Sequence, residues 1–140
     1  MSQDAGWLPF AAIATDIASG KKRVLDHGDL VTAMRASMAV PGVFAPIEWD
    51  EVLLVDGGLA DNLPVDDVRA LGADVVIAVD VGFPLLPRQA LTSILEISSQ
   101  ATTILTQGSA AAQREKLRPG DLLIDPQLGS YPSSDFAHAS

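Results

Sequence analysis

Residues 52–64 confine the middle of the chain to one local structure, in which a buried strand leads through a tight turn into a helix. Their sequence is VLLVDGGLADNLP. The apolar run 52–55 is too short for a helix and is typical of a buried strand. It ends in Asp56 and a pair of glycines, which indicate a turn, and Pro64 suits the first residue of a helix. We therefore expect Asp56 at the carboxyl end of a buried strand, where open α/β sheets place their reactive groups.

Two interpretations of Asp56 are open at this point. In one, its carboxylate merely caps a tight turn, as Asp-Gly sequences often do. In the other, Gly57 and Gly58 let the backbone or a partner side chain approach the carboxylate, because neither carries a Cβ atom. A carboxylate can act as the general base for a serine hydroxyl without a histidine, provided that burial raises its proton affinity.

The composition limits the classes of protein to which the chain can belong. A chain of 140 residues is one domain at most, and 48% hydrophobic with only 19% charged residues indicates a compact globular protein. A net charge of −9 argues against a nucleic-acid partner. The sequence has two histidines and no cysteine, so we expect no metal site and no thiolate chemistry, and the cellular compartment stays open.

The pattern of the first 51 residues predicts two strands, a helix and a ribbon. Asp29 is expected to cap the helix, with Leu30, Met34 and Met38 on one face because they are spaced by four residues. The expected elements are a strand over 10–16, its return strand over 23–26, the helix up to the Pro-Gly pair at 41–42, and a turn-containing ribbon over 47–51.

The second half predicts a strand–helix–strand unit and then a long helix. A helix from residue 65 to Gly72 and a strand over 74–80, apolar on both faces, would join the strand before Asp56 in a parallel βαβ unit. A long amphipathic helix starts near Leu91, and Gly108 is expected to interrupt it before it resumes over 110–117. The last expected elements are a short strand over 122–125 and a loose tail over 127–140.

Other serine and aspartate residues are candidates for a chemical role. The chain has no Gly-x-Ser-x-Gly turn and no glycine-rich loop that could hold an oxyanion. Ser37 is the nearest substitute nucleophile, but a hydroxyl at a helix end usually bonds the backbone. Asp16 and Asp80 also end strands, and for both we expect backbone N–H partners and no catalytic role. A nucleotide-binding α/β domain is disfavoured, because the glycine-rich turn from strand to helix is missing.

Four linked segments resemble the patatin-like phospholipase family in order and spacing. They are residues 14–20, 33–42, 54–64 and 72–80, within a similarity that runs from about residue 8 to residue 82. The resemblance implies an α/β fold with three layers, in which a mostly parallel sheet is flanked by helices. It implies hydrolysis of lipid acyl esters by a serine–aspartate dyad, with Asp56 as the aspartate, Gly57 and Gly58 completing its motif, and Asn62 and Pro64 holding the loop.

The chain also departs from that family. The family's glycine loop and its Gly-x-Ser-x-Gly nucleophile precede every segment present here. The chain therefore resembles the carboxyl-terminal half of the catalytic domain, and its partner would be the missing amino-terminal half. We expect this half-domain over 1–82 and a closing helix and strand over 83–126, which resemble one bacterial branch of the family.

The resemblance further implies a phospholipid or lysophospholipid substrate drawn from a membrane surface, with no cofactor and no metal. Met38, Val43 and Phe44 are candidates for the apolar surface that binds it, although they could equally be core. The location is open between the cytoplasm, a membrane surface and, for a longer protein, secretion or the outer membrane. The rival interpretation is a non-catalytic fragment that acts as an interaction or regulatory module.

Overall fold

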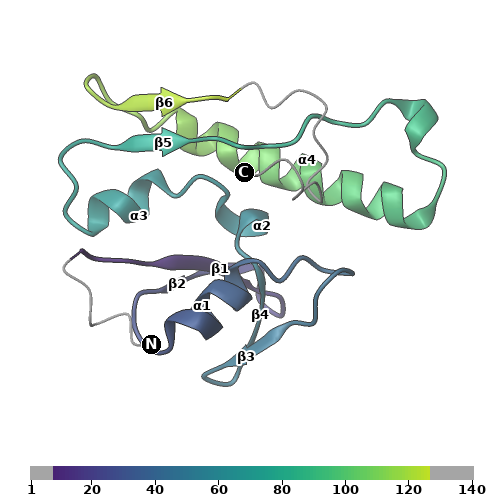
Figure 1. The fold of residues 1–140 in the computed structure, drawn as a ribbon, viewed down its shortest axis with the longest axis horizontal. Helices are drawn as coiled ribbons and strands as arrows, with labels where there is room; N and C mark the ends of the chain where they lie inside the picture. Colours follow the sequence, from purple (N-terminus) through teal and green to yellow (C-terminus); the bar gives the residue numbers. More distant parts are fainter. Residues whose placement is uncertain (1–7, 127–140) are drawn as a thin grey trace, which may run out of the picture.

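A computed structural model describes residues 8–126 of the chain (Figure 1). The elements follow one another as β1 (Ala12–Asp16), β2 (Lys21–Leu25), α1 (Leu30–Ser37), β3 (Ile47–Trp49), β4 (Val52–Asp56), α2 (Gly58–Asp61), α3 (Val65–Ala70), β5 (Ile77–Val79), a 3-10 turn (Arg88–Ala90), α4 (Ile94–Arg114) and β6 (Leu122–Ile124). The chain thus has the mixed helices and strands of an α/β protein. The tail expected over 127–140 lies outside the described residues, and the division at residue 82 stays a prediction.

A four-stranded antiparallel sheet contains the strand that ends in Asp56. Its order is β2-β1-β4-β3, with Ala14 of β1 opposite Asp56 of β4. The β1–β2 hairpin appears where the sequence predicted a strand and its return. The β3–β4 hairpin turns through Asp50 and Glu51, both at positive φ, which matches the right-handed twist of the strands.

The remaining strands form a separate pair. β5 and β6 are parallel and are connected through α4, with Ile77 opposite Leu122. The predicted βαβ unit was wrong, because β4 is already flanked by β1 and β3 and has no free edge for β5. The mostly parallel sheet is likewise not confirmed, since three of the four strand pairings within residues 8–126 are antiparallel.

Helix α1 packs on the antiparallel sheet through small side chains. Asp29 caps it by accepting a 2.9 Å hydrogen bond from the Thr32 amide, as the sequence predicted. Its buried face consists of Ala33 and Ala36, whereas Met34 is 52% exposed. The alanines let the helix approach the sheet more closely than long side chains would. The core here is formed by Ala12, Ala14, Leu25, Ala33, Ala36 and Leu54.

Helix α4 contributes Ala110 to the second core. It begins with a capping box between Ser93 and Glu96 and runs without a break through Gly108, so the predicted interruption was wrong. One glycine costs a helix only about 1 kcal/mol, which the other turns of a long helix outweigh. The second core consists of Leu63, Val65, Val76, Ala78 and Ala110. Figure 1 shows α2 between this part and the antiparallel sheet, and α2 contacts both α4 and β1. None of the helices within residues 8–126 is both long and apolar enough to cross a membrane.

Candidate active site

The backbone around Asp56 is held by two neighbouring elements. The amide of Asp56 donates to the carbonyl of Ala39 at 2.9 Å, and the amide of Gly57 donates to the carbonyl of Ser37 at 3.2 Å. On the other side, the hydroxyl of Thr15 in β1 donates to the carbonyl of Asp56 at 2.8 Å. The turn after β4 is therefore fixed between the end of α1 and the edge of β1.

The carboxyl group of Asp56 is half-buried and has an altered proton affinity. Burial raises the pKa of Asp56 above its ordinary value, and a 2.7 Å hydrogen bond from the Gly58 amide to Oδ1 opposes that rise only in part. Within residues 8–126 this amide is its one hydrogen-bond donor. A carboxylate with raised proton affinity and an oxygen still available is suited to take a proton from a neighbouring group.

The two glycines after Asp56 differ in how much space surrounds them. A Cβ atom on Gly57 would lie 2.0 Å from the carbonyl oxygen of Ile13, which belongs to the backbone of β1. A Cβ atom on Gly58 would meet the side-chain oxygens of Asn62 and Asp56 at 2.7 and 2.9 Å. Gly57 thus lets two backbone segments touch, whereas the space beside Gly58 is bounded by ends of side chains.

The loop after the glycines forms a short helix, α2, that the sequence did not predict. Pro64 precedes α3 and occupies its N-cap position. The amide of Asn62 donates to the hydroxyl of Ser109 at 3.0 Å, and that hydroxyl donates to the carbonyl of Gly58 at 3.1 Å. Ser109 therefore ties α4 to the loop that carries Asp56. The sequence analysis missed Ser109. The pattern that could have indicated it is the spacing of Thr106, Ser109 and Gln113, which places three polar side chains on one face of the long helix.

A cluster of buried polar side chains attaches α2 to β2 and α4. Asp61 accepts hydrogen bonds from Lys22 of β2 at 3.0 Å and from Gln113 of α4 at 2.8 Å. Lys22 also pairs with Asp67 of α3 at 2.6 Å. Sequence reasoning missed Asp61 and Lys22, because a charge that pairs across 39 residues has no local pattern.

A cavity of about 480 Å³ opens beside Asp56. Met38 lines it together with Ser37, while Val43 and Phe44 lie outside its lining. Among the described residues, the hydroxyl of Ser37 makes no hydrogen bond with Asp56. The residues that line the cavity are Phe10, Ala11, Ala12, Ile13, Met34, Ser37, Met38, Asp56, Gly57, Gly58, Asp61, Asn62 and Pro64.

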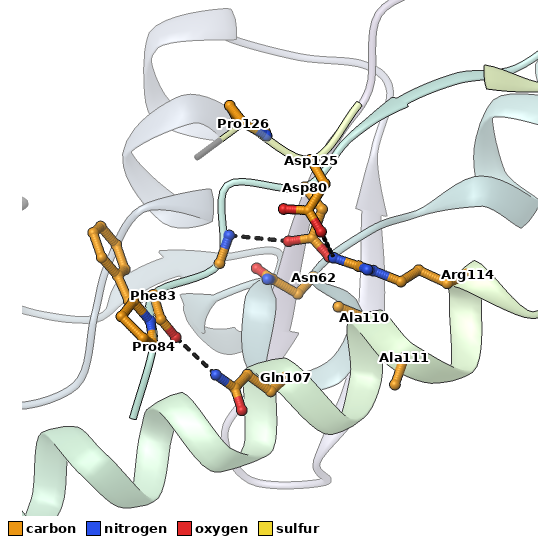
Figure 2. Close-up of a pocket in the computed structure, with 11 residues that line it drawn as sticks. Asn62, Asp80, Phe83, Pro84, Gln107, Ala110, Ala111, Arg114, Asp125 and Pro126 are labelled. Atoms are coloured by element: carbon orange, nitrogen blue, oxygen red, sulfur yellow. Dashed lines mark hydrogen bonds and ion pairs between the residues drawn. The ribbon is translucent and has the colours of Figure 1, made fainter. Parts of the chain in front are cut away.

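A second cavity of about 510 Å³ lies at the carboxyl end of β5 (Figure 2). Arg114 of α4 donates to Asp80 at 2.8 Å and to Asp125 at 3.1 Å, and the Gly82 amide donates to Asp80 at 2.9 Å. Asp80 is therefore a strand-end carboxylate satisfied by backbone and arginine. Asn62 lines both cavities, so the two lie next to each other.

The other strand-end carboxylate also has its partners. Asp16 accepts hydrogen bonds from the Ala18 amide at 3.0 Å and from the Ser19 hydroxyl at 2.6 Å. The Ser19 hydrogen bond is the main cause that lowers the pKa of Asp16, and this direction is opposite to that of Asp56. In the part of the chain that the structure describes, no three His, Cys, Asp or Glu side chains are grouped as metal ligands.

Comparison with known proteins shows which family the segment around this site resembles. Residues 9–69 match the model of the patatin-like phospholipase family. An NTE family protein of Mycobacterium tuberculosis is 46% identical over 74 residues, which are 53% of this chain and 21% of that protein. Patatin-like phospholipase domain-containing protein 7 of Mus musculus is 49% identical over 78 residues, which are 54% of this chain and 6% of that protein.

Over this segment the chain is similar to the patatin-like phospholipase family, and the resemblance deduced from its motifs is confirmed. The chain spans about a fifth of the length of its mycobacterial relative.

Proposed function

We propose that this chain supplies the acid–base half of a serine–aspartate dyad that hydrolyses acyl esters of lipids. The observation that carries the proposal is the carboxyl group of Asp56. It is half-buried, its pKa is raised by burial, and it lines an open cavity at the end of β4. Asp16 and Asp80 end strands as well, but their carboxyl groups are fully occupied by backbone, hydroxyl or arginine donors.

In the proposed mechanism Asp56 moves one proton twice. It takes the proton of the attacking serine hydroxyl as the oxygen bonds to the ester carbonyl carbon, and backbone amides of a glycine loop hold the oxyanion. It then returns the proton to the alcohol that leaves. A water molecule releases the acyl group by the same path. The hydrogen bond from the Gly58 amide fixes Oδ1 and leaves Oδ2 for this proton transfer.

The nucleophile and the glycine loop belong, in this proposal, to an amino-terminal half of the same domain that precedes the matched segment in the family. The matched segments cover only 21% and 6% of the two relatives' lengths, so those proteins have room for such a half, which supports the proposal. That half would also supply the parallel strands that the family fold implies. Ser37 stays the local alternative, because it lines the cavity of Asp56.

The proposed substrate is a phospholipid or lysophospholipid taken from a membrane surface. Met34 and Met38 give the cavity of Asp56 a flexible apolar wall, which suits an acyl chain. Val43 and Phe44 are exposed beyond that wall and are proposed to contact the lipid surface outside the cavity. The names of the relatives, which include phospholipase domains, support the substrate class.

Turnover of a short-chain nitrophenyl ester tests the proposal. The 140-residue chain and a longer gene product that contains it are assayed with and without a serine-directed phosphonate, each also as Asp56→Asn. We expect turnover and labelling in the longer protein, loss of turnover in Asp56→Asn, and no loss in Asp125→Asn, an exposed strand-end control. Turnover by the 140-residue chain would shift the nucleophile to Ser37. An inactive longer protein would favour the rival, an interaction module.

A further inference from the structure

Helix α1 carries its larger apolar side chains on the face away from the sheet. Its buried residues are Ala33 and Ala36. On the opposite face, Val31, Met34 and Met38, which follows the helix directly, are each more than half exposed. Positions 31, 34 and 38 have the spacing of a single helix face. A surface helix normally turns such a face toward the core, so this one indicates a second apolar environment outside the chain's own core.

The turn after α1 extends this apolar surface. Gly42, at a φ of 83°, turns the chain and is followed by Val43 and Phe44, which are 69% and 51% exposed. Figure 1 shows the connection from α1 to β3 extending away from the sheet. We name the exposed apolar side chains of both parts the outer α1 surface. They are Val31, Met34, Met38, Val43 and Phe44.

The amide groups at the tip of this turn already have partners. The amides of Val43 and Phe44 both donate to the carbonyl of Val40, each at 3.0 Å. An amide without a hydrogen-bond partner strongly opposes entry into hydrocarbon, because no water is there to bind it. Since these two amides are occupied within the turn, Val43 and Phe44 can enter the apolar part of a lipid surface. This property favours a lipid partner.

The charges of this segment favour a neutral lipid surface. Residues 30–47 contain one charged side chain, Arg35, although the whole chain has a net charge of −9. That net charge opposes an anionic membrane, and it equally opposes a second copy of the chain. A neutral bilayer is not repelled. Arg35 is exposed and lies four residues after Val31 on the same helix face, so its guanidinium group can contact lipid phosphates.

The outer α1 surface is continuous with the cavity of Asp56. Met34 and Met38 belong to this surface and also line that cavity. Ala39, the residue after Met38, accepts the 2.9 Å hydrogen bond from the Asp56 amide. A lipid surface that contacts Met38 therefore has a defined position relative to the turn that carries Asp56.

We propose that the outer α1 surface is a membrane-docking surface, which enters a neutral phospholipid bilayer and places the opening of the Asp56 cavity against it. This inference rests on the proposed function, because it takes the substrate to come from a membrane. It adds which elements touch the bilayer and what kind of bilayer they fit. An acyl chain then reaches the cavity along Met34 and Met38 without crossing water.

A fluorescent label tests the docking surface. Since the chain has no cysteine, Val43→Cys introduces a single thiol, to which a polarity-sensitive fluorophore is attached. Val75→Cys is the matched control, because Val75 is 60% exposed and lies outside the outer α1 surface. Both labelled chains are mixed with phosphatidylcholine vesicles, with and without brominated acyl chains. Bromine quenches only a fluorophore that enters the bilayer. The longer gene product, with its own cysteines replaced by serine, is labelled in the same way.

We expect the label at position 43 to shift to shorter wavelength and to be quenched by the brominated vesicles, while the label at position 75 stays unchanged. Phe44→Ser should weaken vesicle binding about tenfold, because burial of large apolar side chains drives interfacial binding. Phe83→Ser removes a side chain of similar exposure, 48%, elsewhere on the molecule and should leave vesicle binding unchanged.

Several outcomes would overturn the proposal. They include no binding to phosphatidylcholine vesicles, equal quenching at positions 43 and 75, and stronger binding to phosphatidylglycerol vesicles. A wavelength shift at position 43 without vesicles would overturn it as well. If that shift disappears on dilution, a second copy covers the surface. If it occurs only in the longer gene product, another part of that protein covers it.

Turnover of the soluble nitrophenyl ester by the longer gene product separates this inference from the proposed function. Quenching at position 43 without turnover would retain the docking surface and reject the catalytic dyad. Turnover without vesicle binding would retain the dyad and reject the docking surface.

Discussion

A methyl group on Gly57 would lie 2.0 Å from the carbonyl oxygen of Ile13, so the turn after Asp56 is in direct contact with the backbone of the neighbouring strand. Ile13 belongs to β1, which also donates the Thr15 hydroxyl to the carbonyl of Asp56. The position of the carboxyl group is therefore set by strand packing as well as by its own turn.

The first prediction compares Gly57→Ala with Gly58→Ala. Gly57→Ala forces two backbones apart and should lower the free energy of unfolding by about 3 kcal/mol, as severe overpacking does. Gly58→Ala displaces the ends of the Asn62, Asp56 and Thr106 side chains and no backbone atom, and it gains helix propensity, so we expect a change below about 1 kcal/mol. Urea unfolding followed by circular dichroism measures both. Equal losses would show that the contact with Ile13 is relieved by movement of β1.

The second prediction concerns the pH dependence of stability. Because the pKa of Asp56 is raised by burial, the folded state binds the proton more tightly than the unfolded state. Its ionisation therefore destabilises the fold as the pH rises from the ordinary value of 3.8 through the raised value. Asp56→Asn should raise the free energy of unfolding at pH 7, and this gain should disappear below pH 3.8.

Asp121→Asn is the control of opposite sign. Hydrogen bonds from the backbone amides of Arg118 and Val76 lower the pKa of Asp121, so its carboxylate stabilises the fold above the ordinary value. That contribution is lost as the pH falls through the lowered value. Asp121→Asn should therefore destabilise the protein at pH 7. Chemical denaturation between pH 3 and 7 measures both variants, and a destabilising Asp56→Asn would contradict the burial argument.

The third prediction tests the polar cluster that attaches α2 to β2 and α4. Lys22→Met removes the cation that Asp61 and Asp67 share, leaving the buried carboxylate of Asp61 with Gln113 as its one remaining donor among residues 8–126. Because the Lys22 side chain is partly exposed, we expect a loss of about 2 kcal/mol, less than a fully buried pair would give. Lys21→Met, an exposed neighbour on β2, should change stability by under about 0.5 kcal/mol. Similar losses of stability in Lys22→Met and Lys21→Met would mean that the net charge of the protein, and not this cluster, accounts for the effect.

The fourth prediction concerns the hydroxyl that joins α4 to the loop of Asp56. Ser109→Ala leaves the carbonyl of Gly58 and the amide of Asn62 without that partner, and should cost about 1 kcal/mol. In a turnover-competent protein kcat should fall more than KM rises, because the carboxyl group loses its fixed position. Ser99→Ala, exposed on the same helix, is the control and should leave both unchanged. A rise in KM at constant kcat would assign Ser109 to substrate binding.

The local parts of the fold could be predicted from the sequence, and the long-range pairings could not. A short apolar run that ends in Asp56 and two glycines determines a strand and a turn within a few residues. The partner of β5 depends on which edges are free, and no local pattern reports that β1 and β3 already flank β4. For α1, the spacing of the long apolar side chains did not indicate that packing on the sheet would bury Ala33 and Ala36.

The order β2-β1-β4-β3 has a consequence for how the protein folds. Two of its three pairings are hairpins between strands that follow each other in the chain, and the whole sheet lies within residues 12–56. Contacts this close in sequence form quickly, since little chain entropy is lost when they close. The turn that carries Asp56 is thus attached to the early-forming part of the molecule. Amide hydrogens of β1 and β4 should be the first to gain protection in pulsed exchange, before those of β5 and β6, whose pairing waits for the 21 residues of α4.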